Sequence, residues 1–291
     1  MSKKTLVCIH VMPSEIEMFQ RFMQQYRKAL GYCAEYDVTI KATLNLNPKL
    51  TDWEKSELKQ DYFMELFTNE FAYKGLKNIN QIILDDSFWG TTQQKRESIK
   101  IDYFDQFIFV DTDIAIHELQ LAYQLKAAEN LSGMYIVSPS IPKWWDESWD
   151  FIVHRDFQNS EYGEAFKKEV FDSVYTQNIS SIELRKLPTI KFGCGMHTLY
   201  SKEYWNFVGI PEEFGGYGPE DTFGMFAAIY ARQKGYDINQ YVLDGLYIAE
   251  DYSNREPTIK DKIVTINKKD EFYSKAESLG RELLVSFVNK I

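Results

Sequence analysis

Hydrophobic and polar positions follow two repeating patterns along the first half of the chain. Short apolar runs rich in β-branched and aromatic residues predict strands, and apolar positions three or four residues apart predict amphipathic helices. The predicted strands cover residues 5–11, 36–46, 80–86, 106–113 and 133–139. The predicted helices between them cover residues 14–30, 53–72, 91–104 and 115–130. This alternation of strand and helix favours βαβ units and a mainly parallel sheet.

The second half of the chain has a less regular pattern, so its part of the sheet is expected to be mixed. The predicted elements are a Trp-rich loop after residue 140, helices at 161–178 and 222–235, strands at 191–201 and 239–251, and a terminal amphipathic helix at about 270–289. We therefore expect an α/β fold with a mixed, mainly parallel central sheet flanked by helices. Residues 1–251 are expected to form one domain, and residues 252–291 a C-terminal extension whose amphipathic helix packs on it.

The capping pattern of the first predicted helix indicates where it begins and ends. Ser14 stands at the N-cap position and Glu17 at the capping-box position three residues later. Gly31 stands just past the predicted end, where glycine is common. The pattern predicts that the helix begins directly after Ser14.

The composition of the 291-residue chain is that of an ordinary globular protein, with 44% hydrophobic and 26% charged residues. Aromatic residues make up 15% of the chain, and such side chains serve both as core and as stacking platforms for sugars and bases. The formal net charge of −10 argues against a broad surface for nucleic acid or anionic membranes.

Cysteine usage and hydropathy indicate a cellular compartment. Cys8, Cys33 and Cys194 are odd in number and widely spaced, so they match neither a disulfide framework nor a zinc site. The N-terminal apolar run is too short for a secretory signal, and no apolar run is long enough to span a membrane. We expect a reduced, cytoplasmic protein with no transmembrane segment.

Acidic side chains follow two predicted strands at the edge where open parallel sheets bind ligands. Asp85 and Asp86 end one strand, and Asp111 and Asp113 end the next in the sequence FIFVDTD. In such an Asp-x-Asp turn both carboxylates can reach one small volume, because the intervening residue points away. Hard cations such as Mn²⁺ and Mg²⁺ prefer oxygen ligands and leave positions open for diphosphate oxygens. The pattern therefore predicts a divalent-metal site that also binds a diphosphate.

Each acidic pair also has a purely structural interpretation. Asp113 precedes a predicted helix and could stabilise its first turn as an N-cap. Asp85 and Asp86 are common turn residues. Glu220 and Asp221 begin another predicted helix, where its dipole favours acidic side chains.

Three segments of the chain together resemble a known family. The segments are IILDDSFWGTTQQKRESI, FIFVDTD and GIPEEFGGYGPEDTFGMFAAIYARQKGY. In their order and spacing they are similar to the metal-dependent, DxD-containing glycosyltransferases of the GT-A fold, which is Rossmann-like. The resemblance runs from about Thr5 to about Asp251. It implies transfer of a sugar from a nucleoside-diphosphate donor, with UDP favoured, to an acceptor hydroxyl.

The resemblance also implies roles for individual residues of these segments. Those expected to bind the nucleotide-sugar are Asp85, Asp86, Arg96, Asp111 and Gly216. Those expected to bind Mn²⁺ or Mg²⁺ are Asp111 and Asp113. Those expected to be catalytic are Glu220 and Asp221, with Asp221 as the general base of an inverting reaction.

Two further expectations concern the metal and the acceptor. The family often supplies a late His ligand, but no His follows His197 here, so Asp251 or Glu250 is the expected replacement. The residues expected to line the acceptor site are Trp144, Trp145 and Tyr217, although core packing is the alternative for a tryptophan. The acceptor class stays open among a glycan, a protein, a small metabolite and, with less support, a modified nucleic acid.

Two other functions fit part of the pattern. A metal-dependent nucleotidyltransferase uses a similar nucleotide-binding sheet, but it usually carries a Gly-rich basic signature after the first strand, which HVMPSEIEMF lacks. A non-catalytic nucleotide- or carbohydrate-binding protein on the same scaffold is the second alternative, and the missing late His favours it.

Overall fold

A computed structural model describes most of the chain. The described ranges are residues 2–11, 15–44, 60–71, 82–85, 91–144, 146–179, 181–188, 193–215, 218–252 and 266–291.

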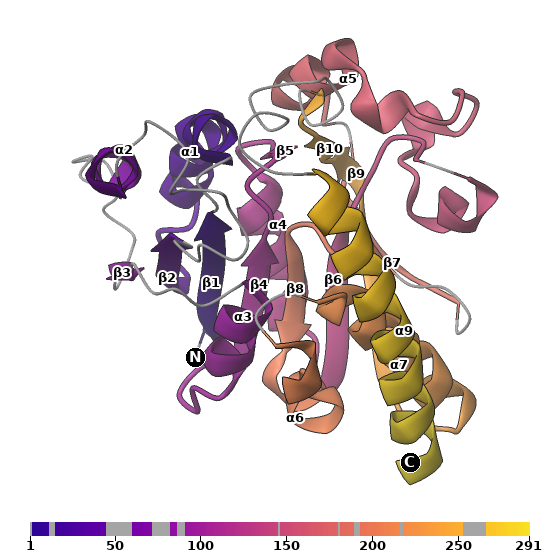
Figure 1. Ribbon diagram of the computed structural model, residues 1–291. Helices are drawn as coiled ribbons and strands as arrows, with labels where there is room; N and C mark the ends of the chain where they lie inside the picture. The colour runs from indigo at the N-terminus through magenta and orange to yellow at the C-terminus, as the bar shows by residue number, and fades with distance from the viewer. Residues whose placement is uncertain are drawn as a thin grey trace.

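The first half of the fold alternates strands and helices as predicted (Figure 1). The strands are β1 (Lys4–Val11), β2 (Asp37–Leu44), β3 (Ile82–Asp85) and β4 (Gln106–Val110). The helices are α1 (Ile16–Gly31), α2 (Gln60–Phe71), α3 (Thr91–Ile99) and α4 (Gln120–Glu129). Apolar periodicity was sufficient here because β1, β2 and β4 are largely buried and α1 and α4 each bury one face.

The second half adds short strands and several short helices. The strands are β5 (Ile114–Ala115), β6 (Met134–Ser140), β7 (Glu183–Lys186), β8 (Thr198–Ser201), β9 (Ile238–Tyr247) and β10 (Ala249–Glu250). The α-helices are α5 (Lys168–Ser173), α6 (Lys202–Val208), α7 (Glu220–Gln233) and α9 (Ile266–Lys290).

The central sheet is mixed and mainly parallel, which confirms the expected fold class. Eight strands lie in the order β3-β2-β1-β4-β8-β6-β9-β7. Four of the seven neighbouring pairs are parallel, and the exceptions involve β8 and β7. A separate two-stranded sheet joins β5 to β10.

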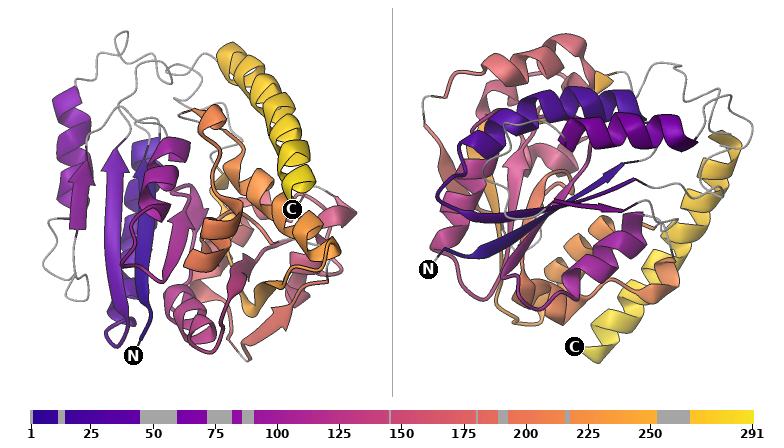
Figure 2. Two further views of the ribbon diagram at one scale, coloured as in Figure 1. Left: turned by 90° about the horizontal axis from the view of Figure 1, so that it is seen from below. Right: turned by 90° about the vertical axis from the view of Figure 1, so that its left-hand side faces the viewer.

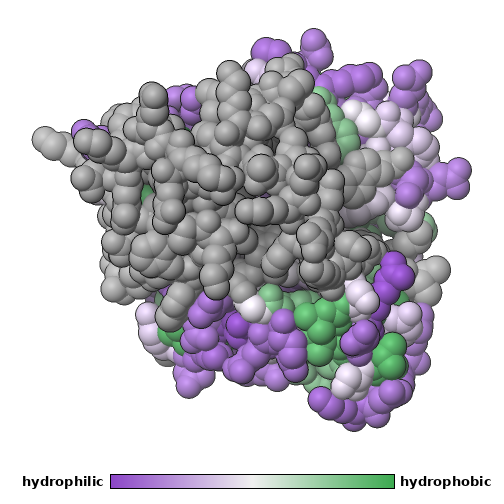
Figure 3. Space-filling view, in the orientation of Figure 1, coloured by the Kyte–Doolittle hydropathy of each residue, from purple (hydrophilic) through white to green (hydrophobic). Residues whose placement is uncertain are grey.

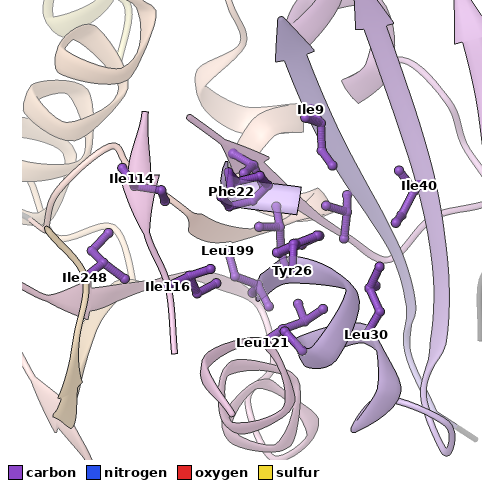
Figure 4. Close-up of a cluster of buried hydrophobic side chains, with 14 of the residues drawn as sticks. Ile9, Phe22, Tyr26, Leu30, Ile40, Ile114, Ile116, Leu121, Leu199 and Ile248 are labelled. Carbon is purple, nitrogen blue, oxygen red and sulfur yellow. The ribbon is translucent and has the colours of Figure 1, made fainter. Parts of the chain in front are cut away.

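Helices cover both faces of the sheet (Figure 2). On one face α1 and α4 bury a large apolar cluster that includes Ile9, Phe22 and Tyr26 (Figure 4). On the other face α6 and α7 bury a second cluster that includes Phe109 and Trp205. The alternation of side chains along β1 and β4 supplies both clusters from the same strands.

The C-terminal helix α9 lies against the second cluster. Its apolar residues Leu279, Leu283, Leu284 and Phe287 pack there, together with Ile291, which follows the helix. Figure 3 shows hydrophobic side chains among polar ones on the lower part of the visible face, where α6, α7 and α9 lie in Figure 1. The division into a domain at 1–251 and an extension at 252–291 stays a prediction.

Several predicted element boundaries are wrong. The predicted helix at 115–130 begins only at Gln120, because β5 occupies the residues after Asp113. The helix predicted at 91–104 ends at Ile99, and the one at 161–178 is reduced to α5 between 3₁₀ turns. Within the described part of the strand predicted at 191–201, residues 193–197 are not in a strand, and β8 begins at Thr198. Strand β7 and helix α6 were not predicted, because each is too short to show a period.

The first helix begins one residue later than predicted, and the capping box that involves Ser14 stays a prediction. The N-cap of α1 is Glu15, and no side chain makes a capping hydrogen bond there. Ser14 lies outside the described residues.

Two global expectations can be compared with the structure. None of the described helices is both long enough and apolar enough to span a bilayer. The three cysteines are buried free thiols, as expected from their spacing.

Candidate active site

The carboxyl ends of β1, β2, β3 and β4 lie at one edge of the sheet, because these strands are mutually parallel. Asp85 is the last residue of β3, and Asp111 directly follows β4. Strand β8 runs antiparallel to β4, so the residues that lead into β8 also lie at this edge. The topology thus brings three distant parts of the sequence to one place.

The pleat of β4 decides which side Asp111 faces. Phe107 and Phe109 belong to the apolar cluster under α6 and α7, and Ile108 and Val110 belong to the opposite cluster. Asp111 is two residues after Phe109, so its side chain points to the same side of the sheet as the side chains of Phe107 and Phe109. It therefore lies on the side of α3 and α7.

Helix α3 holds the first turn of α7 through three buried polar side chains. Lys95 Nζ lies 2.5 Å from Glu220 Oε1, and Thr92 Oγ1 donates to Glu220 Oε2 at 2.8 Å. The exposed fractions of Thr92, Lys95 and Glu220 are 0%, 9% and 6%. The Gly218 N–H also donates to Thr92 Oγ1, at 2.8 Å. A buried charge is stable only when it is paired in this way.

The Asp221 carboxylate lies against the backbone that leads into β8. A Cβ atom added at Gly195 would come within 2.3 Å of Asp221 Oδ2, so only glycine fits there. The other oxygen, Asp221 Oδ1, accepts the N–H of Thr222 at 2.6 Å. The carboxylate is thus held between β8 and the start of α7.

Electrostatics confirm that these charged groups share one small volume. The pKa of Asp111 is raised to about 7, chiefly by burial and also by the nearby carboxylates of Asp113, Asp221 and Glu220, against the opposing effect of Lys95. Burial and Glu220 also raise the pKa of Asp221. Burial lowers the pKa of Lys95, but the attraction of Glu220, Asp111 and Asp221 outweighs burial and raises it above its ordinary value. Three carboxylates, those of Asp111, Glu220 and Asp221, therefore interact with Lys95, and Asp113 adds a fourth negative charge near Asp111.

Asp113 is connected to Asp251 through the backbone. Strands β5 and β10 pair antiparallel, and the Asp251 N–H donates to the Asp113 carbonyl oxygen at 2.6 Å. The Asp251 carboxylate is buried and accepts Arg21 Nη2 at 2.6 Å and Arg21 Nε at 3.1 Å. This ion pair competes with the metal-binding role predicted for Asp251.

The start of β5 also decides between the two interpretations of Asp113. Helix α4 has Leu119 as its N-cap and begins at Gln120, so Asp113 does not cap it. The N-cap interpretation is wrong, and the metal interpretation is still available to Asp113.

The chemistry of the site fits a divalent cation at Asp111 and Asp113. The carboxylate cluster has more negative than positive charge, and its oxygens are the donors that Mn²⁺ and Mg²⁺ prefer. Over the described ranges, no three His, Cys, Asp or Glu side chains are grouped so that they could hold a metal by themselves. The protein's own ligands would therefore have to be completed by oxygens of a bound diphosphate or by water.

Arg96 is buried beneath the loop before α7. Its Nε donates to Ile210 O at 3.1 Å, and its Nη2 donates to Pro211 O at 2.7 Å and Gly215 O at 3.1 Å. These contacts fix the loop that precedes Glu220. The predicted contact of Arg96 with the donor diphosphate stays a prediction.

The predicted acceptor residues are only partly described. Trp144 is 5% exposed and packs against Trp149 and Phe166, with ring centroids 5.7 and 5.0 Å away. Core packing is the role that these contacts show, and acceptor binding by Trp144 stays a prediction. Four other predicted site residues lie outside the described residues: Asp86, Trp145, Gly216 and Tyr217.

Sequence reasoning missed three residues of the site. Thr92 and Lys95 carry no motif of their own, and at helical spacing they resemble ordinary surface positions. Their signal was the pair of a Thr and a Lys three residues apart on the helix after an acidic strand end. Gly195 could have been noticed as one of two glycines flanking Cys194.

Comparison with known proteins supports the fold. No protein-family model matches the chain, and no curated protein matches its sequence. The structure is similar to mannosyltransferase PcManGT from Pyrobaculum calidifontis in complex with GDP-Man and Mn²⁺, with a TM-score of 0.51 and 9% identity, covering 88% of this chain and 59% of that one. It is also similar to S. aureus TarS, with a TM-score of 0.48 and 12% identity, covering 84% of this chain and 36% of that one.

The fold assignment rests on the mannosyltransferase and on the strand order of the sheet. This chain spans about three fifths of the mannosyltransferase, so the likeness concerns the shared region. The mixed sheet, its flanking helices and the acidic edge agree with that likeness. The protein has a GT-A glycosyltransferase fold.

Proposed function

We propose that this protein is a glycosyltransferase that moves a sugar from a nucleoside-diphosphate donor to an acceptor hydroxyl. The observation that carries the proposal is the cluster of Asp111, Glu220 and Asp221 around Lys95, with Asp113 near Asp111, at the carboxyl edge of a GT-A sheet. Active sites are the places where burial and like charges shift carboxylate pKa values in this way.

Asp111 and Asp113 are the proposed ligands of a Mn²⁺ or Mg²⁺ ion. When bound, the metal would neutralise charge that develops on the leaving nucleoside diphosphate. The excess of carboxylates in the cluster supports a bound cation, because a positive charge would offset their mutual repulsion. The similar mannosyltransferase is in complex with GDP-Man and Mn²⁺, which supports the use of a divalent metal.

Asp221 is the proposed general base. Its raised pKa suits a group that must take a proton from an acceptor hydroxyl near neutral pH. Oxygen Oδ1 is held by the Thr222 N–H, so the carboxylate has a fixed orientation. The acceptor oxygen would attack the anomeric carbon as its proton passes to Asp221, which gives inversion.

The donor nucleotide is proposed to be UDP or GDP. The motif resemblance favours UDP, and the similar mannosyltransferase binds GDP-Man. Both nucleotides present the same diphosphate to the metal, so the acidic edge accommodates either.

The test is release of nucleotide from UDP-, GDP- and TDP-sugars, each with Mn²⁺, Mg²⁺ or EDTA. We expect one donor to be turned over only with metal, and the activity to be lost in Asp113→Ala. Asp102→Ala is the matched control, because the Asp102 side chain is 98% exposed and lies at the opposite end of β4. Binding of a nucleotide-sugar without any turnover would favour a non-catalytic binding protein. Transfer of the nucleotidyl group instead of the sugar would favour a nucleotidyltransferase.

A further inference from the structure

The Lys95–Glu220 pair has no role in the reaction as proposed so far. Lys95 Nζ is buried, makes a 2.5 Å contact with Glu220 Oε1 and lies 5.4 Å from the centroid of the Phe109 ring. It thus connects three elements of the site, namely α3, α7 and β4. The other ion pair on α3 in the described part of the chain, Lys100–Glu97, is far more exposed, with side chains 54% and 36% exposed against 11% and 7% for Lys95 and Glu220.

Glu220 is occupied in a way that separates it from Asp221. Both of its carboxylate oxygens accept hydrogen bonds from α3, one from Lys95 and one from Thr92. A carboxylate held by two buried donors is a structural anchor and is poorly placed to receive a substrate proton. The next residue, Asp221, has its Oδ2 directed at Gly195, on the other side of the helix start.

This anchor lies at the first turn of α7, where a small shift of the backbone changes the orientation of the Asp221 side chain. Thr92 Oγ1 accepts the Gly218 N–H at 2.8 Å and also lies 3.3 Å from the Gly218 carbonyl oxygen. Thr92 therefore holds both the residue that precedes the turn and the first residue of the helix. A shift of this turn would move Asp221 with it.

We propose that Lys95 and Thr92 are positioning residues, which act through Glu220 to fix the Asp221 carboxylate beside Asp111. This inference rests on the proposed function, because it assigns these two residues to the orientation of the proposed base. Lys95 also provides the one cationic side chain whose attraction to both Asp111 and Asp221 is evident in the described part of the chain.

The structure offers a close control for Lys95. Lys202 is another nearly buried lysine, with a side chain 13% exposed against 11% for Lys95. Its Nζ donates to Ile99 O at 2.5 Å and lies 5.6 Å from the Phe107 ring centroid. It lies at the other end of α3 and β4, because its own N–H donates to Asp105 O.

The experiment compares Lys95→Met with Lys202→Met in the full-length chain, with the donor that the nucleotide-release assay identifies. We expect Lys95→Met to lower kcat at least about tenfold while KM for the donor changes little, because a misplaced base slows the chemical step. Lys202→Met should keep the wild-type kcat. Thr92→Val should also lower kcat, as Lys95→Met does. Thr92→Ser keeps the hydroxyl and should keep the wild-type kcat. Lys95→Arg keeps the charge and should keep part of it.

A pH profile separates positioning from a general loss of folded protein. The titratable groups that face Asp221 are Glu220 from α7, Lys95 from α3, Asp111 from the end of β4 and Tyr200 from β8. Loss of the Lys95 charge should move the acidic limb of kcat/KM to higher pH. If Lys95 had only a structural role, its replacement would lower kcat/KM at every pH and leave the midpoint of the acidic limb unchanged.

The possible failures can be told apart. If Lys95→Met matches Lys202→Met in kcat and in pH profile, the positioning role is refuted and the proposed function stands. If the wild-type chain turns over no donor, the proposed function fails and this inference fails with it. If Thr92→Ser is as impaired as Thr92→Val, the hydroxyl bridge to Glu220 is refuted.

Discussion

Asp111 is the residue at which function and stability conflict most clearly. Its carboxylate follows β4 directly and lies among three other carboxylates, with Lys95 as the compensating charge. Burial and repulsion favour its protonated form, which raises its pKa to about 7. A metal ligand must be ionised, so the fold holds this group in a costly state.

We predict that Asp111→Asn stabilises the protein at alkaline pH. The folded-state pKa of about 7 lies above the ordinary value of 3.8, so the ionised carboxylate destabilises the fold as pH rises through 7. The partial exposure of Asp111 reduces the effect, and we expect a gain of about 2 kcal/mol at pH 8. The gain should shrink as the pH falls toward 4. Urea unfolding at pH 8 and pH 5 measures it.

Asp102→Asn is the control for this measurement, because the Asp102 side chain is 98% exposed. Equal unfolding free energies for wild type and Asp111→Asn at pH 8 would contradict the assigned burial of charge.

Gly195 gives a second prediction at this scale. An added Cβ would lie 2.3 Å from Asp221 Oδ2 and 3.1 Å from Asp221 Cβ, so the carboxylate must move. We expect Gly195→Ala to reduce turnover about tenfold or more, since small displacements of a catalytic group are costly. Gly31→Ala is the matched control, because nothing lies within 4 Å of a Cβ there. Retention of full activity in Gly195→Ala would show that Asp221 is not held at this position.

At the scale of elements, the active site depends on contacts between helices and strands that are distant in sequence. Helix α3 anchors the start of α7 through Glu220, and β10 anchors the chain after Asp113. Helix α1 contributes Arg21, which pairs with Asp251 beside β10. Contacts from α3, β10 and α1 thus hold the segments that carry the acidic residues of the site.

Helix α9 completes the opposite side of α7, and this packing can be tested. Phe287 lies half-buried, with ring centroids 5.8 Å from Phe207 and 6.2 Å from Phe223. We expect Phe287→Ala to lower the free energy of unfolding by about 2 kcal/mol, less than for a fully buried ring. Val285→Ala on the same helix is the control, since Val285 is 61% exposed and its change should cost under about 0.5 kcal/mol. Chemical denaturation of both variants decides whether α9 is part of the core.

At the scale of the whole molecule, buried histidines make stability depend on pH. His197 is fully buried, its Nδ1 lies 2.7 Å from Gln124 Oε1, and burial lowers its pKa to about 3. Burial also lowers the pKa values of His10, His117 and His154. Each of these groups is neutral in the fold and gains a proton on unfolding in mild acid.

We predict that the protein loses stability as the pH falls below 6.5. The unfolded state binds a proton at His197 between pH 6.5 and about 3, while the folded state does not. For His197 alone the loss at pH 5 is about 2 kcal/mol, at 1.36 kcal/mol per pH unit. His197→Asn removes the titration, and Asn tolerates the positive φ of 44° found there.

The measurement is thermal or urea unfolding of both proteins from pH 7.5 to pH 5. The wild-type protein should lose more stability than His197→Asn over this range. Protonation of Asp111 stabilises the fold as the pH falls, which is opposite to the effect of the histidines. Asp111 is present in both proteins, so the difference between their unfolding free energies reports His197 alone. Parallel curves would contradict the burial of a neutral imidazole.

The sequence by itself determined the order of the elements in the first half and the α/β class. This was possible because each long strand and helix there buries one or both faces, and burial imposes a period on the apolar residues. The Asp-x-Asp position after β4 could also be predicted directly, since a pair of acidic residues after the apolar run Phe107 to Val110 is conspicuous. The strand Gln106–Val110 could be predicted without any tertiary information.

Only the tertiary structure decided what these acidic residues are next to. Asp113 looked equally suitable as a helix cap until β10 paired with β5 and delayed the helix to Gln120. Lys95 looked like a solvated charge until α3 and α7 met at Glu220, a contact between residues 125 positions apart. The physical reason is that periodicity reports whether a residue is buried, whereas the partner of a buried charge depends on which elements the fold brings together.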